Sequence, residues 1–222
     1  MMGPMSRTAQ PYPAHPPGQE ITEIKAELRA AIRAERARLD PARRARAAAG
    51  LAAVVTDLPQ VSAAGCVSAY VSRPSEPGTA ALLERLAARG TRILLPTLDG
   101  LRRDWAWFTT AAELLVRAPG RPPEPAGPCL GPEVLELAEA IIAPALAVDT
   151  AGTRLGQGGG WYDRVLQHAS SEAVVIALVY ANEVYDAGTR PLPVEEHDRG
   201  VDIVATPDGW QWLRTPNPAS AR

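Results

Sequence analysis

A glycine-rich stretch holds the residues with the clearest chemical potential: Arg154-Leu155-Gly156-Gln157-Gly158-Gly159-Gly160-Trp161-Tyr162-Asp163-Arg164. The backbone N–H groups of a loop with so few side chains can approach an anion closely, and phosphate is the usual one. Arg154 and Arg164 add positive charge, and Asp163 is an oxygen ligand of the kind that Mg²⁺ takes beside phosphates. The stretch predicts a phosphate-binding loop, although its glycines alone would also fit a surface turn.

Two common phosphate motifs do not fit this loop. The P-loop requires a Lys directly after its last glycine, and no Lys follows any glycine in the chain. The dinucleotide fingerprint G-x-G-x-x-G also fails, because its last position, counted from Gly156 and Gly158, is Trp161. The loop therefore belongs to another class of phosphate site.

The residues around the loop resemble the 5-formyltetrahydrofolate cyclo-ligase family, also called methenyltetrahydrofolate synthetases. The family pattern reads approximately P-x-L-A-F-D-x-x-G-x-R-L-G-x-G-G-G-Y-Y-D-R-x-L, and the chain follows it from Pro144 to Leu166. Val148 replaces the usual Phe and Trp161 the first Tyr. The change to Trp161 keeps a stacking face but exchanges a phenol for an indole donor.

Four other segments extend the resemblance, which covers about residues 20 to 206. They are Lys25-Ala26-Glu27-Leu28-Arg29 (K-x-x-L-R), Glu76 with Thr79 (E-V-D-T), Glu124-Pro125 (E-P), and 191–198 (P-x-E-x-H-D). Pro77-Gly78 departs from the second motif, which leaves open how Glu76 reaches the pteridine. From the residues alone, Glu76 is equally well explained as a carboxylate near a helix N-terminus.

The resemblance implies an enzyme that converts 5-formyltetrahydrofolate and ATP to 5,10-methenyltetrahydrofolate, ADP and phosphate with Mg²⁺. It implies ATP contacts at Lys25, Arg29, Arg154, Leu155, Gly156, Gln157, Gly158, Gly159, Gly160, Trp161 and Tyr162. Folate contacts are implied at Glu76, Gln157, Gly158, Gly159, Gly160 and Trp161. Asp163 and Asp198 are the implied magnesium ligands, and Arg154 and Lys25 the catalytic cations.

Two other functions stay open at this stage. The departures at Trp161 and Pro77-Gly78 are compatible with an ATP-dependent enzyme on the same fold that acts on a different substrate. The chain could also be a folate- or nucleotide-binding regulator without catalysis. The non-catalytic alternative is disfavoured by the presence of Asp163, Asp198 and Arg154. A protein that only binds a nucleotide has less need of a metal beside the phosphates.

Length, charge and cysteine content indicate the general class of protein. The chain has 222 residues, 46% hydrophobic and 22% charged, with a net charge of −2. This length suits one sizeable core, and the balanced charge gives no footprint for nucleic acid or acidic membranes. Cys66 and Cys129 lack metal-ligand or C-x-x-C spacing, so we expect free thiols rather than a disulfide. We expect a monomeric cytoplasmic protein, without a signal peptide or membrane span.

The elements that position these residues follow from hydrophobic periodicity. Helices are predicted at 20–39, 44–55 and 79–89, and strands at 65–71, 92–96, 105–108, 140–146, 173–180 and 201–206. Asp40 is expected to cap the second helix ahead of Pro41. This alternation predicts a three-layer α/β/α domain around a mainly parallel sheet, with its ligand crevice at the carboxyl ends of the strands.

Several finer expectations depend on this arrangement. The family resemblance implies that the loops 72–78, 150–161 and 195–199 converge on one cleft. The basic residues after Arg29 on the first helix should form a solvated face. We expect the aromatics of 105–108 to pack in the core rather than line a pocket, and His197 to be a polar loop residue rather than a zinc ligand. A Pro-rich disordered tail is predicted at 1–19, a domain at 20–210 and a C-terminal tail at 211–222.

Overall fold

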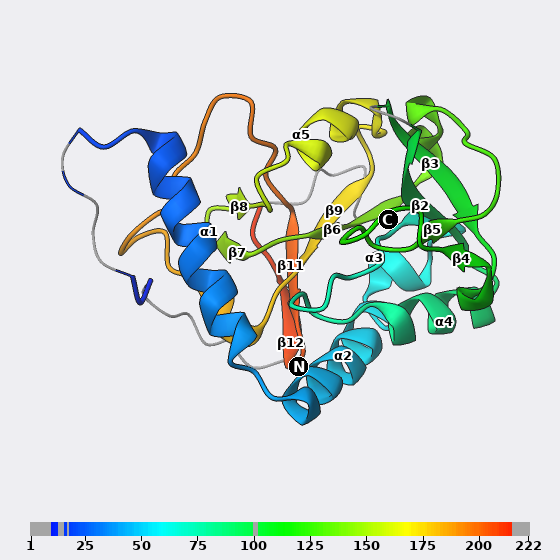
Figure 1. Cartoon of the computed structure of the whole chain (residues 1–222), viewed down its shortest axis with the longest axis horizontal. Helices are drawn as coiled ribbons and strands as arrows, with labels where there is room; N and C mark the ends of the chain where they lie inside the picture. Colours follow the sequence, from blue (N-terminus) through cyan, green and yellow to red (C-terminus); the bar gives the residue numbers. More distant parts are fainter. Residues whose placement is uncertain (1–9, 13–15, 17, 100–101, 215–222) are drawn as a thin grey trace.

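The apolar runs form a seven-stranded sheet in the computed structural model, which describes residues 10–12, 16, 18–99 and 102–214 (Figure 1). In spatial order the strands are β12 (Gly209–Trp212), β11 (Ile203–Thr206), β9 (Val174–Leu178), β6 (Ala140–Pro144), β1 (Cys66–Ser68), β2 (Arg92–Asp99) and β3 (Arg102–Phe108). The five inner strands are parallel, and only the edge strands β12 and β3 pair antiparallel. The predicted parallel sheet is confirmed.

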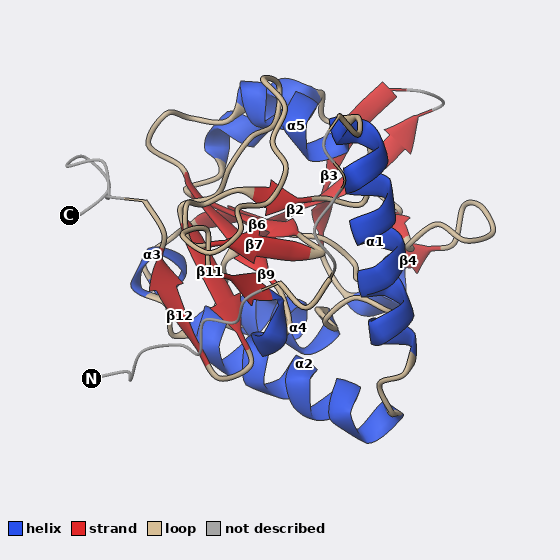
Figure 2. Cartoon of the chain, turned by 90° about the vertical axis from the view of Figure 1, so that its left-hand side faces the viewer, coloured by secondary structure: helices blue, strands red, loops and turns tan. Residues whose placement is uncertain are grey.

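Both faces of the sheet are covered because the inner strands place apolar side chains on each face. Successive side chains point to opposite faces, so Val67 and Ile142 join one apolar cluster while Cys66 and Ile141 join another. Helices α2 (Pro41–Thr56) and α4 (Ala80–Ala88) cover the first face. Helix α5 (Trp161–Val165) covers the second (Figure 2). The predicted three-layer α/β/α domain is confirmed.

Helix α1 (Ile21–Ala37) stands apart from these layers and packs on a second, small sheet (Figure 1). That sheet contains β10 (Val184–Tyr185), β7 (Ala147–Asp149) and β8 (Arg154–Leu155). Leu28 and Ile32 of α1 are buried with Leu155 and Tyr185 of the sheet. This packing holds α1 beside the glycine-rich loop, which begins directly after β8.

The remaining elements are short connections. They are α3 (Pro59–Ser62), β4 (Leu114–Leu115), β5 (Glu124–Pro125), and the 3-10 turns η1 (Ala111–Glu113), η2 (Pro132–Leu137), η3 (Leu166–His168) and η4 (Ala181–Glu183). Asp40 caps α2, as predicted, by accepting a hydrogen bond from the Arg43 N–H. Cys66 and Cys129 are both free, as predicted. Within the described residues, no helix is both long and apolar enough to cross a membrane.

Three features differ from the sequence predictions. Arg36 of α1 is not solvated: it is 1% exposed, because Glu183 and backbone carbonyls supply it with acceptors inside the protein. The domain boundary expected at residue 210 falls inside β12, where Trp212 pairs with Ile203. The predicted 1–19 tail lies largely outside the described residues, but Gln10 and Tyr12 contact Arg190. Trp105, by contrast, lies in the core as predicted.

Candidate active site

A cleft of about 700 Å³ opens at the carboxyl ends of β1, β2 and β6. Tyr70 follows β1, Pro96 lies on β2 and Pro144 ends β6, and all three line the cleft. Helix α1 and the glycine-rich loop supply its other walls. Every residue that the sequence placed in the site lines this cleft: Lys25, Arg29, Glu76, Arg154 to Asp163 without a gap, and Asp198. The predicted convergence of the three loops therefore occurs.

The glycine-rich loop spans residues 156–160 between β8 and α5. Its entry is fixed by the buried Asp149, whose carboxylate accepts the N–H groups of Ala151, Thr153 and Leu192 at 2.9 to 3.0 Å. Gly158 (φ +97°) and Gly160 (φ +58°) adopt left-handed conformations that favour glycine. The N–H groups of residues 157–160 donate no hydrogen bond to any described part of the chain. They are free to bind an anion.

Helix α1 holds this loop through two arginines. Arg29 donates from Nε to the Gly156 carbonyl at 2.9 Å, and Arg33 donates from Nη2 to the Gln157 carbonyl at 2.7 Å. Arg33 also donates to the side-chain Oε1 of Gln157 at 3.1 Å. Since an arginine can only donate, the Nε2 of Gln157 must face the other way.

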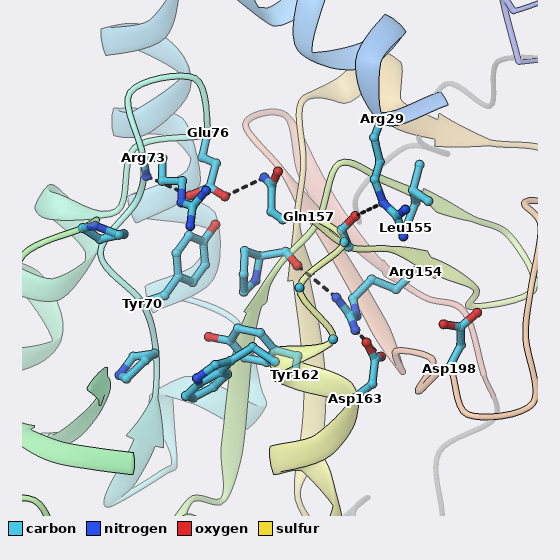
Figure 3. Close-up of a pocket in the computed structure, with 18 of the residues that line it drawn as sticks. Arg29, Tyr70, Arg73, Glu76, Arg154, Leu155, Gln157, Tyr162, Asp163 and Asp198 are labelled. Carbon is cyan, nitrogen blue, oxygen red and sulfur yellow. Dashed lines mark hydrogen bonds and ion pairs between the residues drawn. The ribbon is translucent and has the colours of Figure 1, made fainter. Parts of the chain in front are cut away.

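That Nε2 group reaches across the cleft to Glu76. It donates to Glu76 Oε1 at 2.7 Å, while Glu76 Oε2 accepts the Arg73 N–H at 2.8 Å (Figure 3). The buried Thr79 closes the same loop by donating to the Tyr70 carbonyl at 2.7 Å. Glu76 is 6% exposed and points into the cleft, so its carboxylate is more than a helix cap.

Arg154 and Asp163 form an ion pair at the other end of the cleft. Arg154 Nη2 lies 2.6 Å from Asp163 Oδ1, and the Arg154 side chain is 3% exposed (Figure 3). The Arg154 guanidinium also lies 5.9 Å from the centre of the Tyr162 ring. Burial raises the pKa of Tyr162, so this phenol remains neutral at neutral pH.

A second charged cluster lies where α1 meets the 195–199 loop. Lys25 is 3% exposed and bonds both Glu195 Oε2, at 2.6 Å, and Asp198 Oδ2. The hydrogen bond from Lys25 lowers the pKa of Glu195. Burial alone would raise the pKa of Asp198, but the Glu195 N–H and the Lys25 ammonium together lower it.

The donor atoms in this cluster fit a divalent cation. One ligand atom each from Glu195, His197 and Asp198 lies within 4.8 Å of the others. Two of the three are carboxylates, the ligand type that Mg²⁺ prefers. Asp163 is adjacent rather than part of the group: its Oδ1 accepts the Arg199 N–H at 3.2 Å and is paired with Arg154. The two predicted magnesium ligands thus lie on neighbouring segments.

Three residues of the site were not predicted from the sequence. Arg33 is exposed, as predicted, but it also holds the glycine-rich loop, because it lies four residues after Arg29 and so on the same side of the helix. Glu195 stands inside the P-x-E-x-H-D segment but received no role. Tyr70 had no signal, because nothing in the apolar run 65–71 marks this residue as part of a cleft.

The chain is similar to proteins of known family. A model of the 5-formyltetrahydrofolate cyclo-ligase family matches residues 21–207. The 5-formyltetrahydrofolate cyclo-ligase of Mycolicibacterium smegmatis is 42% identical over 145 residues, which cover 64% of this chain and 73% of that protein. The Escherichia coli K12 protein of the same name is 31% identical over 188 residues, 82% of this chain and 100% of that protein.

Solved structures agree with the sequence comparisons. The structure of the Aquifex aeolicus 5,10-methenyltetrahydrofolate synthetase superposes with a TM-score of 0.74 at 26% identity, and covers 87% of this chain and 95% of that one. The resemblance drawn from residues 144–166 is confirmed, and the chain belongs to the 5-formyltetrahydrofolate cyclo-ligase family.

Proposed function

We propose that this chain uses ATP to convert 5-formyltetrahydrofolate to 5,10-methenyltetrahydrofolate, releasing ADP and phosphate. The terminal phosphoryl group of ATP moves to the formyl oxygen, which turns a poor leaving group into a good one. N10 of the folate then attacks the formyl carbon and loses its proton. Phosphate leaves with the former formyl oxygen. In phosphoryl transfer of this kind, positioning and charge stabilisation supply most of the catalysis.

The observation that carries the proposal is the set of free anion-binding groups in the cleft of a family member. Residues 157–160, whose N–H groups have no hydrogen-bond partner in the described part of the chain, line the same cleft as Lys25, Arg29 and Arg154. Together they can cradle a polyphosphate, with Lys25 and Arg154 placed to stabilise the charge that develops in the transition state. Leu155, Trp161 and Tyr162 line the wall beside them.

The acidic residues divide between metal and folate in this proposal. Asp198, with Asp163 on the neighbouring segment, would hold Mg²⁺, and the carboxylate of Glu195 adds a third oxygen ligand. Mg²⁺ bound there would neutralise charge on the transferring phosphoryl group. Glu76, across the cleft, would bind the folate, with Gln157 to Trp161 between the two substrates.

The test is a spectroscopic assay for methenyltetrahydrofolate with ATP, Mg²⁺ and 5-formyltetrahydrofolate. Arg154→Ala and Asp163→Ala should each lower kcat by about 10²- to 10³-fold, since each removes a charge from the reacting centre. Arg43→Ala, an exposed arginine of α2 away from the cleft, is the matched control and should keep full activity. ATP hydrolysis without methenyl product would refute the folate assignment, and wild-type turnover in either variant would refute that residue's role.

A further inference from the structure

The hydroxyl of Tyr70 is a buried polar group without a partner. Tyr70 is 4% exposed and lines the cleft, yet its Oη neither gives nor receives a hydrogen bond among the described residues. Buried hydroxyls are normally satisfied, because a missing partner costs free energy. A group of this kind in a binding cleft indicates an acceptor or donor that a ligand supplies.

The neighbours of this hydroxyl define what it can bind. In Figure 3 the Tyr70 ring lies next to the Glu76–Gln157 pair with its hydroxyl directed towards Glu76. Burial, helped by the negative charge of Glu76, raises the pKa of Tyr70, so the phenol keeps its proton at neutral pH. This end of the cleft therefore offers a hydrogen-bond donor, the phenol, beside an acceptor, the carboxylate.

The Gln157 amide shows which ligand group the carboxylate accepts. Its Nε2 donates to Glu76 Oε1 at 2.7 Å from within the cleft. A planar ring N–H at the same place would make the same bond. A ring that carries an N–H next to a carbonyl would satisfy the acceptor and the donor together, and the pyrimidinone edge of a pterin has this pattern.

We propose that Tyr70 is a substrate-recognition residue, whose hydroxyl donates to the 4-oxo group of the pterin while Glu76 accepts from the adjacent ring N–H. This inference rests on the proposed function and adds a specificity determinant to it. A substrate with a 4-amino group in place of the carbonyl has no proton on the adjacent ring nitrogen, so it would present a lone pair to the Glu76 carboxylate, which can only accept. The chain should discriminate against such a ligand, since a site built to hydrogen-bond one group rejects the analogue that lacks it.

The experiment compares two variants with two ligands. Binding of 5-formyltetrahydrofolate and of its 4-amino counterpart is measured by calorimetry on the full chain without ATP. Tyr70→Phe should weaken binding of the 4-oxo ligand about tenfold, or about 1.4 kcal/mol, and weaken binding of the 4-amino ligand, which lacks the ring N–H for Glu76, much less. Tyr180→Phe is the matched control. It also removes a buried hydroxyl with no partner among the described residues, but Tyr180 does not line the cleft, and both ligands should bind it as they bind wild type.

Activity separates the two levels of the proposal. In Tyr70→Phe the KM for the folate should rise while the KM for ATP stays constant. If wild type forms methenyltetrahydrofolate but Tyr70→Phe binds both ligands as wild type does, the Tyr70 assignment is wrong and the proposed function stands. Equal weakening of both ligands, or the same loss in Tyr180→Phe, would also overturn it. A wild-type chain that neither binds nor converts the folate overturns both.

Discussion

Helix α1 buries two cations, Lys25 near its start and Arg36 near its end, in different kinds of surroundings. Arg36 is bonded on two sides by Glu183, at 2.7 Å from both Nε and Nη2, and the Glu183 side chain is 5% exposed. Lys25 is nearly as buried, but its partners Glu195 and Asp198 keep 31% and 16% of their side chains exposed. One pair is closed in the core; the other opens into the cleft.

This difference separates a structural charge from a functional one. Arg36 also donates to the carbonyl of Ala145 at 2.8 Å, and so ties α1 to the corner between β6 and β7. Its acceptors cannot be given to a ligand without opening the core. The carboxylates that hold Lys25 face the cleft, so ligand or metal can exchange with them at little cost to the fold.

The largest effect is expected from Arg36→Ala. It leaves Glu183 buried without its cation, and breaking a buried pair in this way costs about 3–5 kcal/mol. Urea denaturation should show this loss in the free energy of unfolding. Arg38→Ala is the matched control, because Arg38 pairs with Glu35 on the exposed side of the same helix and should stay within about 0.5 kcal/mol of wild type. A small loss in Arg36→Ala would show that the closed pair is not structural.

Lys25→Met should have the opposite profile. The methionine keeps the apolar stem but removes the charge, so kcat/KM should fall about 100-fold, or about 2.7 kcal/mol of transition-state stabilisation. The free energy of unfolding should change much less than in Arg36→Ala, since Glu195 and Asp198 remain partly hydrated. Steady-state kinetics and urea denaturation on the same preparation test this. If Lys25→Met lowered the free energy of unfolding but kept wild-type turnover, Lys25 would be a structural cation like Arg36.

The fold and the main site residues could be predicted because they leave local signals. Strands β6, β9 and β11 are apolar runs, and Asp40-Pro41 marks the start of α2 by its own chemistry. The glycine block is specific enough to bring Arg154 to Asp163 into the site without knowledge of the fold.

What escaped prediction depends on pairs of residues far apart in the chain. Arg36 looks like any charge on a helix surface until Glu183, 147 residues later, supplies its acceptors. Tyr70 lies near the end of an apolar run, and only the folded chain shows that its hydroxyl is directed towards Glu76. The strand β12 was missed because it has only four residues, and its pairing with β11 rather than a long apolar run makes it a strand.

The smallest effect is expected from Arg33→Met, which tests whether the functional part of α1 extends from Lys25 to the arginine that holds the glycine-rich loop. Arg33 is exposed and holds Gln157 by hydrogen bonds of 2.7 and 3.1 Å, while Arg29 and Glu76 hold the loop independently. Losing these hydrogen bonds should weaken the hold on the loop conformation that binds the substrates by about 1 kcal/mol. KM for ATP and for folate should therefore rise about threefold to fivefold. The free energy of global unfolding should not change.

Limited proteolysis should then cut the loop faster in Arg33→Met than in Arg38→Ala, which removes the arginine at the C-terminal end of α1 that pairs with Glu35. If Arg33→Met lowered kcat/KM as much as Lys25→Met does, Arg33 would act on the phosphates directly. No change in either KM would mean that Arg29 alone fixes the loop, and that the functional part of α1 ends one turn earlier.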